Sequence, residues 1–301
     1  MSLFVVSESV RKRALEMYNR TEKLFRDDVE TLKKWMKTQP HLPEIMDEAK
    51  IANFLILTKC SVEKAKRRID MYYTIRRIIP DFYDDANPKL PHMQEHMDVC
   101  YCVLHPQLTE EMYRVFFIKV KLSNKCQPRL AAMQIYNASE IRLYQDCMVG
   151  EVLVIDMIDT SLEDVTRMTP TLLAKIYTIY KNVYSFRLKA VYVINSRPYV
   201  SLVMPIVKML LKPKIYQRIY IHEDSEILHK LFSKDTLPRD YGGEGPSLDD
   251  LNGALKASFN EYQGRFDQLD KLRVDERLRP EKLNNDELLG FYGNFKKLDV
   301  D

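Results

Sequence analysis

Residues 150–195 have the sequence GEVLVIDMIDTSLEDVTRMTPTLLAKIYTIYKNVYSFRLKAVYVIN. Two short runs rich in β-branched residues, 152–158 and 190–195, enclose a helical pattern over 170–186. Buried parallel strands have this composition, and a helical crossover lets two strands of one sheet run parallel. The stretch therefore predicts a strand–helix–strand unit of an α/β fold.

The flanking sequence extends the same alternation. Residues 115–120 (VFFIKV) and 216–221 (YQRIYI) resemble further strands, and 130–149 has a second helical pattern. Repetition of strand, helix and strand predicts a mixed, mostly parallel sheet flanked by helices, with right-handed crossovers. Only 8 glycines occur in 301 residues, which argues against a β-sandwich or barrel with many tight turns.

Helical patterns precede and follow this region. Residues 8–78 have apolar spacings typical of helices, with Ser61 as an N-cap, and a proline- and aspartate-rich linker follows. From Ser247 the apolar residues recur every three or four positions, which predicts one long helix. We therefore expect three parts: an N-terminal bundle of three to four helices (1–79), an α/β domain (92–245) and a C-terminal helical extension (246–301).

Positive charge is concentrated in one segment. Residues 165–222 contain ten Lys or Arg and no Asp or Glu, while the remainder of the chain holds 36 basic and 43 acidic residues. The same segment includes the most apolar short run, 199–211, in which Ser201 and Lys208 are the polar members. A basic surface beside an apolar element indicates an anionic partner with an apolar core, a membrane surface before any other.

The apolar run 199–211 has two interpretations. As a helix it would be about 20 Å long, too short to span a bilayer. It could be a buried core helix. Pro198 and Pro205 divide it and Pro213 ends it, with lysines at its exit, so a movable lid over an apolar cavity fits better.

No motif of catalysis or metal binding has the required spacing. The residues His92, His96, Cys100, Cys102 and His105 lack the pairs of a zinc site, so a polar linker entering a strand is the simpler interpretation. Asp156 and Asp159 end a strand, where caps and turns are common. The sequence contains no G-x-S-x-G, H-E-x-x-H or P-loop motif, and no RNP-like pattern. We expect neither an enzyme nor a nucleic-acid-binding protein, and no cofactor.

Five scattered cysteines predict no disulfide framework and favour a reducing compartment. The apolar patch near the N-terminus is too short for a signal peptide, and no apolar window is long enough for a membrane span. These features predict a soluble, cytoplasmic protein. We also expect it to be a monomer that associates transiently with membranes.

The order of these elements resembles the CRAL-TRIO lipid-binding family. The resemblance rests on 150–156 (GEVLVID), 185–195 (SFRLKAVYVIN), 214–218 (KIYQR) and 237–243 (LPRDYGG), and it covers about residues 10–245. The C-terminal sequence GFYGNFKKLDVD is similar to an arthropod branch related to the α-tocopherol transfer and retinaldehyde-binding proteins.

The resemblance implies three sets of site residues. The expected ligand cavity is lined by Leu130, Met133, Asn137, Ile155, Met168, Ile176, Ile179, Tyr180, Val183 and Val191. The expected lid carries Val200, Val203, Ile206, Val207 and Leu210. The expected phosphoinositide-binding residues are Arg187, Lys189, Lys214 and Arg218. Asn137, Tyr180 and Asp156 are candidates for orienting the ligand.

The family's role implies intracellular binding and transfer of one hydrophobic molecule, such as a retinoid, tocopherol or carotenoid, with docking to phosphoinositide-containing membranes. A phospholipid exchange protein is one alternative. A scaffold without transfer activity, or a regulator of small GTPases on the same fold, is an alternative of another class.

Overall fold

The computed structural model describes residues 3–4, 8–184 and 186–280. In this part of the chain, one sheet has the strand order β1-β2-β3-β4-β5. β1 and β2 pair antiparallel, and the other neighbours pair parallel. The predicted mixed, mostly parallel sheet is therefore confirmed. The strands are β1 (Cys100–Leu108), β2 (Tyr113–Val120), β3 (Gly150–Asp156), β4 (Leu188–Ile194) and β5 (Ile219–Ile221).

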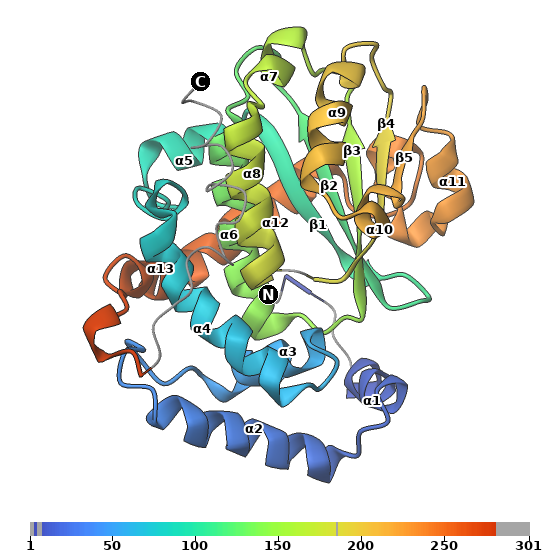
Figure 1. Ribbon diagram of the computed structural model, residues 1–301. Helices are drawn as coiled ribbons and strands as arrows, with labels where there is room; N and C mark the ends of the chain where they lie inside the picture. The colour runs from blue at the N-terminus through green and yellow to red at the C-terminus, as the bar shows by residue number, and fades with distance from the viewer. Residues whose placement is uncertain (1–2, 5–7, 185, 281–301) are drawn as a thin grey trace.

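Helices surround the sheet and form the N-terminal part of the molecule (Figure 1). The α-helices are α1 (Glu8–Met17), α2 (Glu22–Lys37), α3 (Glu48–Leu57), α4 (Val62–Ile78), α5 (Pro91–His96), α6 (Pro128–Gln145), α7 (Leu162–Thr166), α8 (Pro170–Ile179), α9 (Val200–Leu210), α10 (Pro213–Tyr216), α11 (Ile227–Leu231), α12 (Leu248–Glu261) and α13 (Gln263–Leu269). The short 3-10 turns are η1 (Pro80–Phe82), η3 (Lys234–Thr236), η4 (Arg239–Tyr241) and η5 (Glu276–Leu278), and η2 (Tyr180–Tyr184) is a π-turn.

Several expected boundaries need correction. The helix expected over 170–186 ends at Ile179 and continues as the π-turn η2. The strand expected over 216–221 begins as the helical turn α10, because Pro213 starts a helix, and only its last three residues pair with β4. The helix expected from Ser247 breaks at Tyr262 into α12 and α13. Residues 281–301 of the expected extension lie outside the described residues.

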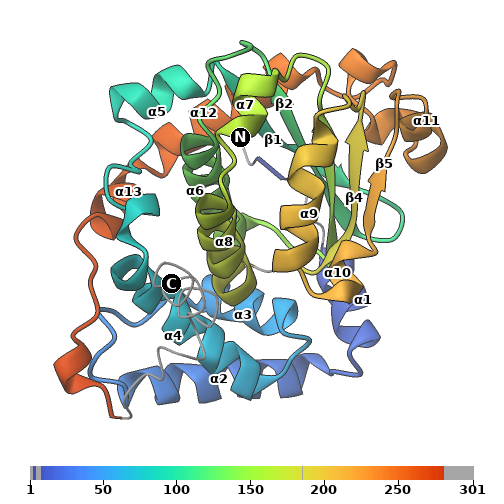
Figure 2. The ribbon, with the colours of Figure 1, turned by 45° about the horizontal axis from the view of Figure 1, so that its top comes forward.

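The two faces of the sheet have different covers. Helices α6, α8 and α9 lie over one face, where Figure 2 shows α8 and α9 side by side. On the opposite face Val103, Val115 and Val154 pack against Leu228 of α11 and Leu248 of α12. Because side chains of a strand alternate between faces, each buried strand supplies apolar residues to both layers. The face under α9 is the one that contains the candidate site.

The N-terminal helices share a core with the α/β region. Helix α3 packs against α6, and α4 packs against η2. One buried cluster joins Phe25 of α2 and Ile51 of α3 to Met133 of α6 and Ile179 of α8. The inner side of α6 therefore faces the sheet, while its outer side faces the N-terminal helices.

A buried ionic network links helices α3, α4, α6 and α13. Lys50 of α3 donates to Glu140 of α6 (2.6 Å), which also accepts from Tyr72 of α4 (2.7 Å) and Arg265 of α13 (3.1 Å). Arg265 in turn donates to Glu44 (2.7 Å). Because Lys50 and Glu140 are fully buried, each depends on the other charges for its solvation.

Among the described helices, none has both the length and the apolarity to cross a bilayer.

Candidate functional site

A cavity of about 320 Å3 lies between the sheet and helices α6, α8 and α9. Its walls are apolar and aromatic side chains, with one pair of charged residues. The lining residues are Phe116, Ile118, Ala132, Ile135, Tyr136, Ser139, Arg142, Glu151, Leu153, Ile155, Leu173, Ile176, Tyr177, Tyr180, Tyr184, Phe186, Leu188, Val191, Val207, Leu210, Leu211 and Ile215.

The strand alternation that predicted the sheet also builds the floor of the cavity. Glu151, Leu153 and Ile155 of β3 are two residues apart and line the cavity from one face. Phe116 and Ile118 of β2 extend that floor. Parallel pairing places Phe116 beside Leu153 and Ile118 beside Ile155, so the floor is continuous across two strands.

Four of the ten expected cavity residues line it: Ile155, Ile176, Tyr180 and Val191. The structure corrects the other six, which lie outside the lining: Leu130, Met133, Asn137, Met168, Ile179 and Val183. Met133, Ile179 and Val183 are fully buried in the core shared with the N-terminal helices, and Leu130 is a buried member of the same core. Met168 lies in the turn between α7 and α8.

Helix α6 turns a different side toward the cavity from the one expected. The lining residues Ala132, Ile135 and Ser139 follow helical spacing along one stripe. The expected residues Met133 and Asn137 lie on the adjacent stripe, because each residue turns the helix by about 100°. Asn137 donates to the Ala86 carbonyl (2.6 Å). That stripe therefore holds the N-terminal helices and not the cavity.

Aromatic residues that the sequence interpretation did not assign form much of one wall. The rings of Tyr136 and Tyr184 stack with centroids 5.3 Å apart, and Tyr184 and Phe186 are 6.3 Å apart. Tyr136 donates its hydroxyl to the Ile176 carbonyl (3.2 Å), which joins α6 to α8. Tyr184 and Phe186 belong to the basic segment 165–222, whereas Tyr136 comes from α6.

Polar groups gather at one end of the cavity. Arg142 donates to the Glu151 carboxylate, and both residues are buried. Burial is the main factor that raises the pKa of the Glu151 carboxyl, and Arg142 opposes this increase. The Tyr180 hydroxyl is buried beside the Leu188 backbone. Burial raises the pKa of this hydroxyl, and the Glu151 charge raises it further.

Of the three expected orienting groups, Tyr180 alone lines the cavity. Asn137 is bonded to Ala86, as described above. Asp156 accepts from the Ile158 amide (3.0 Å), Asn195 (2.8 Å) and Tyr241 (3.0 Å). Asp156 therefore holds the turn after β3 against β4 and η4. This agrees with the turn role that is common for an acid at the end of a strand.

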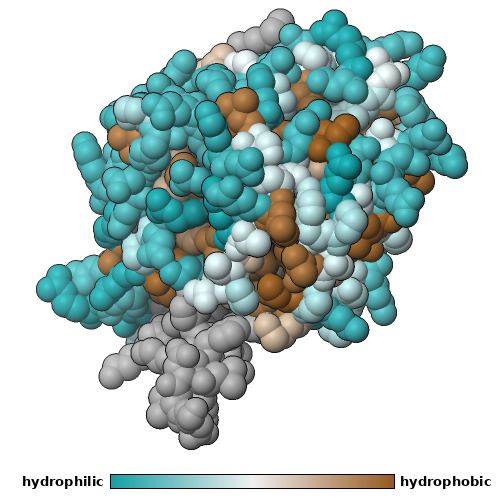
Figure 3. All heavy atoms as spheres, turned by 90° about the horizontal axis from the view of Figure 1, so that it is seen from above, coloured by the Kyte–Doolittle hydropathy of each residue, from teal (hydrophilic) through white to brown (hydrophobic). Residues whose placement is uncertain are grey.

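Helix α9 covers the cavity with its C-terminal half. Val207 and Leu210 line the cavity, whereas Val200 and Val203 pack against the sheet beside Val191 and Val193. The expected lid residue Ile206 is half-buried. Pro205 lies inside the helix and provides no amide for the bond to Ser201. The outer side exposes Leu202 (57%) and Met209 (55%), and Figure 3 shows hydrophobic patches on the face seen from above.

A second pocket of about 320 Å3 lies near the junction of α4 and η2 and is basic. Arg187 lines it, together with five basic residues that the sequence interpretation did not assign: Lys59, Lys64, Arg67, Arg68 and Lys181. No acidic residue of the described chain lines this pocket. Because α4 packs against η2, which begins with the cavity residue Tyr180, this basic pocket adjoins the wall of the apolar cavity.

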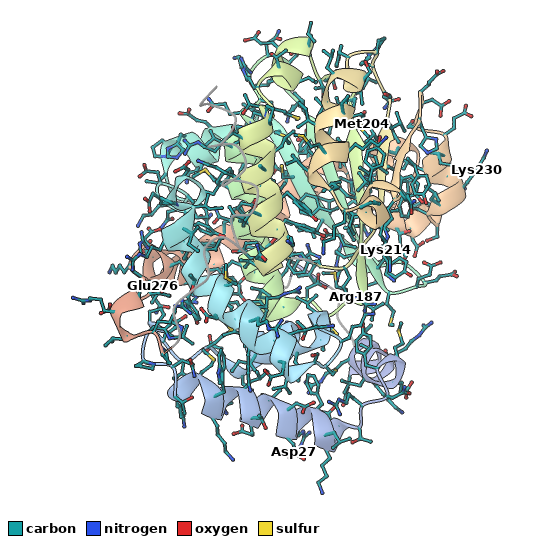
Figure 4. The ribbon with its side chains drawn as sticks, in the orientation of Figure 1. Asp27, Arg187, Met204, Lys214, Lys230 and Glu276 are labelled. Carbon is teal, nitrogen blue, oxygen red and sulfur yellow. The ribbon has the colours of Figure 1, made fainter. Side chains whose placement is uncertain are left out.

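The other three expected headgroup residues do not line the basic pocket. Lys189 lies over the Tyr113 ring at 4.8 Å, and Arg218 donates to the Leu188 carbonyl. Lys214 is exposed on α10. In Figure 4, Lys214 lies near Arg187 on the side of the molecule that faces α3. Arg187 also donates to the Tyr18 hydroxyl.

The His92–His105 region has structural contacts. His96 accepts from the Gln127 amide (3.2 Å), and the thiols of Cys100 and Cys102 are 3.9 Å apart in β1. Within residues 3–4, 8–184 and 186–280, no group of three or more potential metal ligands is suitably arranged.

Several known proteins and domains are similar to this chain in sequence. A model of the Pinta-like UBA domain matches residues 21–93, and a model of the CRAL/TRIO domain matches residues 98–243. The human α-tocopherol transfer protein-like is 24% identical over 294 residues, which cover 94% of this chain and 85% of that protein. Clavesin-1 of Xenopus laevis is 25% identical over 251 residues, 80% of this chain and 74% of that protein. The crystal structure of Sfh5 aligns with a TM-score of 0.49 at 14% identity, covering 87% of this chain and 99% of that one. The match of the family model shows that this chain contains a CRAL/TRIO domain over residues 98–243.

Proposed function

We propose that this chain binds one lipophilic molecule in the cavity beneath α9 and transfers it between membranes, without catalysing a reaction. The cavity itself carries the proposal, because mostly apolar and aromatic side chains of the sheet and three helices line it. Burial of a ligand there is favoured by about 25 cal/mol per Å2 of apolar area removed from water. The name of the human relative, a transfer protein-like chain, supports the same function.

The cavity volume favours a small cargo. A volume of about 320 Å3 lies at the lower end of the range of about 300–1,000 Å3 typical of small-molecule sites. A retinoid-sized lipid with one chain fits this volume better than a phospholipid with two acyl chains. Aromatic walls at Tyr136, Tyr177 and Tyr184 also suit an unsaturated or ring-containing cargo. Phospholipid exchange is therefore the second candidate.

Cargo class can be measured directly. The purified protein is incubated with a lipid extract that contains retinoids, tocopherols and phospholipids, and is then separated from free lipid. Mass spectrometry of the organic extract should detect a single-chain or ring lipid at close to one molecule per chain. A diacyl phospholipid at that ratio would favour exchange. An empty protein would favour the scaffold or GTPase-regulator alternative.

We assign membrane docking to the basic pocket. Its six basic residues provide donors for an anionic headgroup such as a phosphoinositide, and their field attracts an anionic membrane. Arg187 belongs both to this pocket and to the expected phosphoinositide-binding residues, which also include Lys189, Lys214 and Arg218. The proposal therefore adds three residues of α4 to the docking surface: Lys64, Arg67 and Arg68.

We assign the role of movable lid to α9. The half of α9 that covers the cavity follows Pro205, so this half is the part of the wall best placed to move when a cargo enters or leaves. The missing amide at that position weakens the helix between the half packed on the sheet and the half over the cavity. The exposed Leu202 and Met209 would meet lipid when the protein docks.

A further inference from the structure

Strand β5 lies at the end of the sheet and has a free side (Figure 1). In the described chain β4 pairs with one side of β5, and no strand pairs with the other. The His222 amide donates to the Val193 carbonyl of β4 (2.8 Å). Since the bonding positions alternate along a parallel strand, the amides and carbonyls of Ile219 and Ile221 point away from β4.

The free side of β5 carries exposed apolar side chains. Tyr220 is 45% exposed and Ile221 is 46% exposed. The strand Ile219–Ile221 contains no proline and no charged residue, the two features with which proteins commonly prevent a free edge from pairing with another strand. Its length of three residues is the protection that remains, and this limits the strength of pairing without preventing it.

Opposite charges flank β5. Lys212 and Lys214 precede the strand, and Glu223, Asp224 and Glu226 follow it. All five side chains are exposed, and within the described chain none of them forms an ion pair. The strand thus has a basic end and an acidic end. Two antiparallel copies of β5 would bring the basic end of each copy to the acidic end of the other, which is electrostatically complementary.

We propose that β5 pairs antiparallel with β5 of a second copy, so that two chains form a symmetric dimer with one continuous sheet. A two-fold axis at Tyr220 places Ile219 of one copy opposite Ile221 of the other, and the outward amides and carbonyls of these residues then bond to each other. The dimer goes beyond the proposed function and departs from the monomer expected from the sequence.

The same register also pairs the exposed side chains. Tyr220 lies opposite Tyr220 of the second copy, and it already stacks on Tyr192 with ring centroids 5.3 Å apart. On the other face of the strand, Ile221 meets Ile219 of the second copy. Aromatic and β-branched cross-strand pairs of this kind stabilise antiparallel sheets. Because the strand is short, the interface is small and the dimer dissociates on dilution.

Sedimentation equilibrium of the full chain, from about 5 to about 500 µM, measures the dimer. The average mass should rise from one chain toward two over this range. Ile221→Pro removes an outward amide that β4 does not use and should keep the protein monomeric. Ile221→Val retains that amide and should dimerise like the unaltered protein. Thermal unfolding verifies that both variants are folded.

Reversal of the flanking charges tests the antiparallel arrangement. One variant carries Lys212→Glu and Lys214→Glu, and a second carries Glu223→Lys and Glu226→Lys. Each variant alone should dimerise at least about tenfold more weakly, because like charges meet at both ends of the paired strands. An equimolar mixture of the two variants brings opposite charges together again at both ends and should dimerise about as well as the unaltered protein.

The control reverses two exposed acids of the N-terminal helices, by Glu16→Lys and Asp27→Lys. Figure 4 shows Asp27 on α2 at the lower end of the molecule. This control should dimerise like the unaltered protein.

A mass of one chain for the unaltered protein over the whole range would overturn the inference and leave the free edge to another partner. Equal dimerisation of folded Ile221→Pro and Ile221→Val would also overturn it. So would a mixture of the two charge variants that dimerises no better than its components. Each of these results leaves cargo binding in the cavity, and therefore the proposed function, intact.

Discussion

Gly243 has no space for a side chain. A Cβ atom at this position would lie 1.8 Å from the Leu237 carbonyl oxygen, a backbone atom that cannot rotate away. The amide of Gly243 donates to the Pro238 carbonyl (3.1 Å). The glycine in the sequence LPRDYGG is therefore required by the close approach of two backbone segments.

Gly243→Ala should lower the free energy of unfolding by about 3 kcal/mol, because the backbone must move apart to admit a methyl group. The matched control is Gly253→Ala in α12, where nothing lies within 4 Å of the added Cβ. That change should raise stability by about 0.5–1 kcal/mol, since alanine favours the helix. Urea denaturation measures both, and equal effects of the two substitutions would refute the packing argument.

Glu140 makes stability sensitive to acid. Burial acts to raise the pKa of its carboxyl, but the charges of Lys50, Arg265 and Arg76 lower that pKa from 4.5 to about 2. The unfolded chain therefore binds more protons than the folded one between these values. The stabilisation, on the order of 3 kcal/mol, is complete above about pH 4.5 and is lost as the pH falls through 2.

Glu140→Gln should flatten this dependence and destabilise the protein at pH 7 by about 3–5 kcal/mol, because Lys50 and Arg265 lose a buried partner. Urea unfolding at pH 7, 5 and 3.5 provides the comparison. The account fails if the unaltered protein and the variant lose stability in parallel below pH 4.5.

At the scale of single elements, α4 is the helix whose role the sequence did not reveal. Its residues 64–68 (KAKRR) include Lys64 and Arg67, which are exposed beside Lys59 in the basic pocket. A run of charge on a helix is normally a solvated face, so the sequence alone gave no reason to select it. Arg187 and Arg218 were predicted, but each has a protein partner, Tyr18 or Leu188.

Reversing the charge of basic residues on and beside α4 tests docking and leaves the hydrogen bonds of Arg187 and Arg218 in place. The triple variant Lys59→Glu, Lys64→Glu, Arg67→Glu should bind phosphoinositide liposomes at least about 100-fold more weakly. The reason is that each basic residue near an anionic surface contributes about 1 kcal/mol. Liposome flotation at two salt concentrations measures the loss.

The control makes the same change in net charge elsewhere, by Lys125→Glu, Lys230→Glu and Lys271→Glu. These residues are exposed, none of them lines the basic pocket, and in Figure 4 Lys230 lies at the right-hand edge of the molecule. If both triple variants lose binding equally, net charge and not the basic pocket directs docking.

Helix α6 shows why half of the cavity could not be assigned from the sequence. It is buried toward both the sheet and the N-terminal helices, so apolar residues occupy more than one stripe. Periodicity identifies such a helix but does not distinguish its faces. On β3 the side chains alternate between only two faces of the sheet, so the cavity face was easier to assign. Ile155 lies on the face under α9.

At the scale of the whole molecule, the sheet was the most predictable part. Strands β2, β3 and β4 are buried on both faces and therefore appear as unbroken apolar runs. The edge strand β1 contains His105, Pro106 and Gln107, and the sequence predicted no bounds for it, only a polar linker entering a strand. The association of the N-terminal helices with α6, through Lys50 and Glu140, depends on pairing 90 residues apart in sequence and left no local signal.

The central claim is that one lipid occupies the cavity beneath α9. Val207 lines that cavity and Leu202 lies on the outer side of the same helix, so Val207→Trp and Leu202→Trp form a matched pair. The larger side chain at Val207 fills the cavity, at a cost in stability of about 1–3 kcal/mol, and thermal unfolding verifies that both variants are folded.

Native mass spectrometry after incubation with the same lipid extract is the most direct test. The unaltered protein and Leu202→Trp should each carry one lipid per chain, whereas folded Val207→Trp should carry less than about a tenth of that amount. Equal lipid occupancy in Val207→Trp and Leu202→Trp, or none in the unaltered protein, would contradict the account.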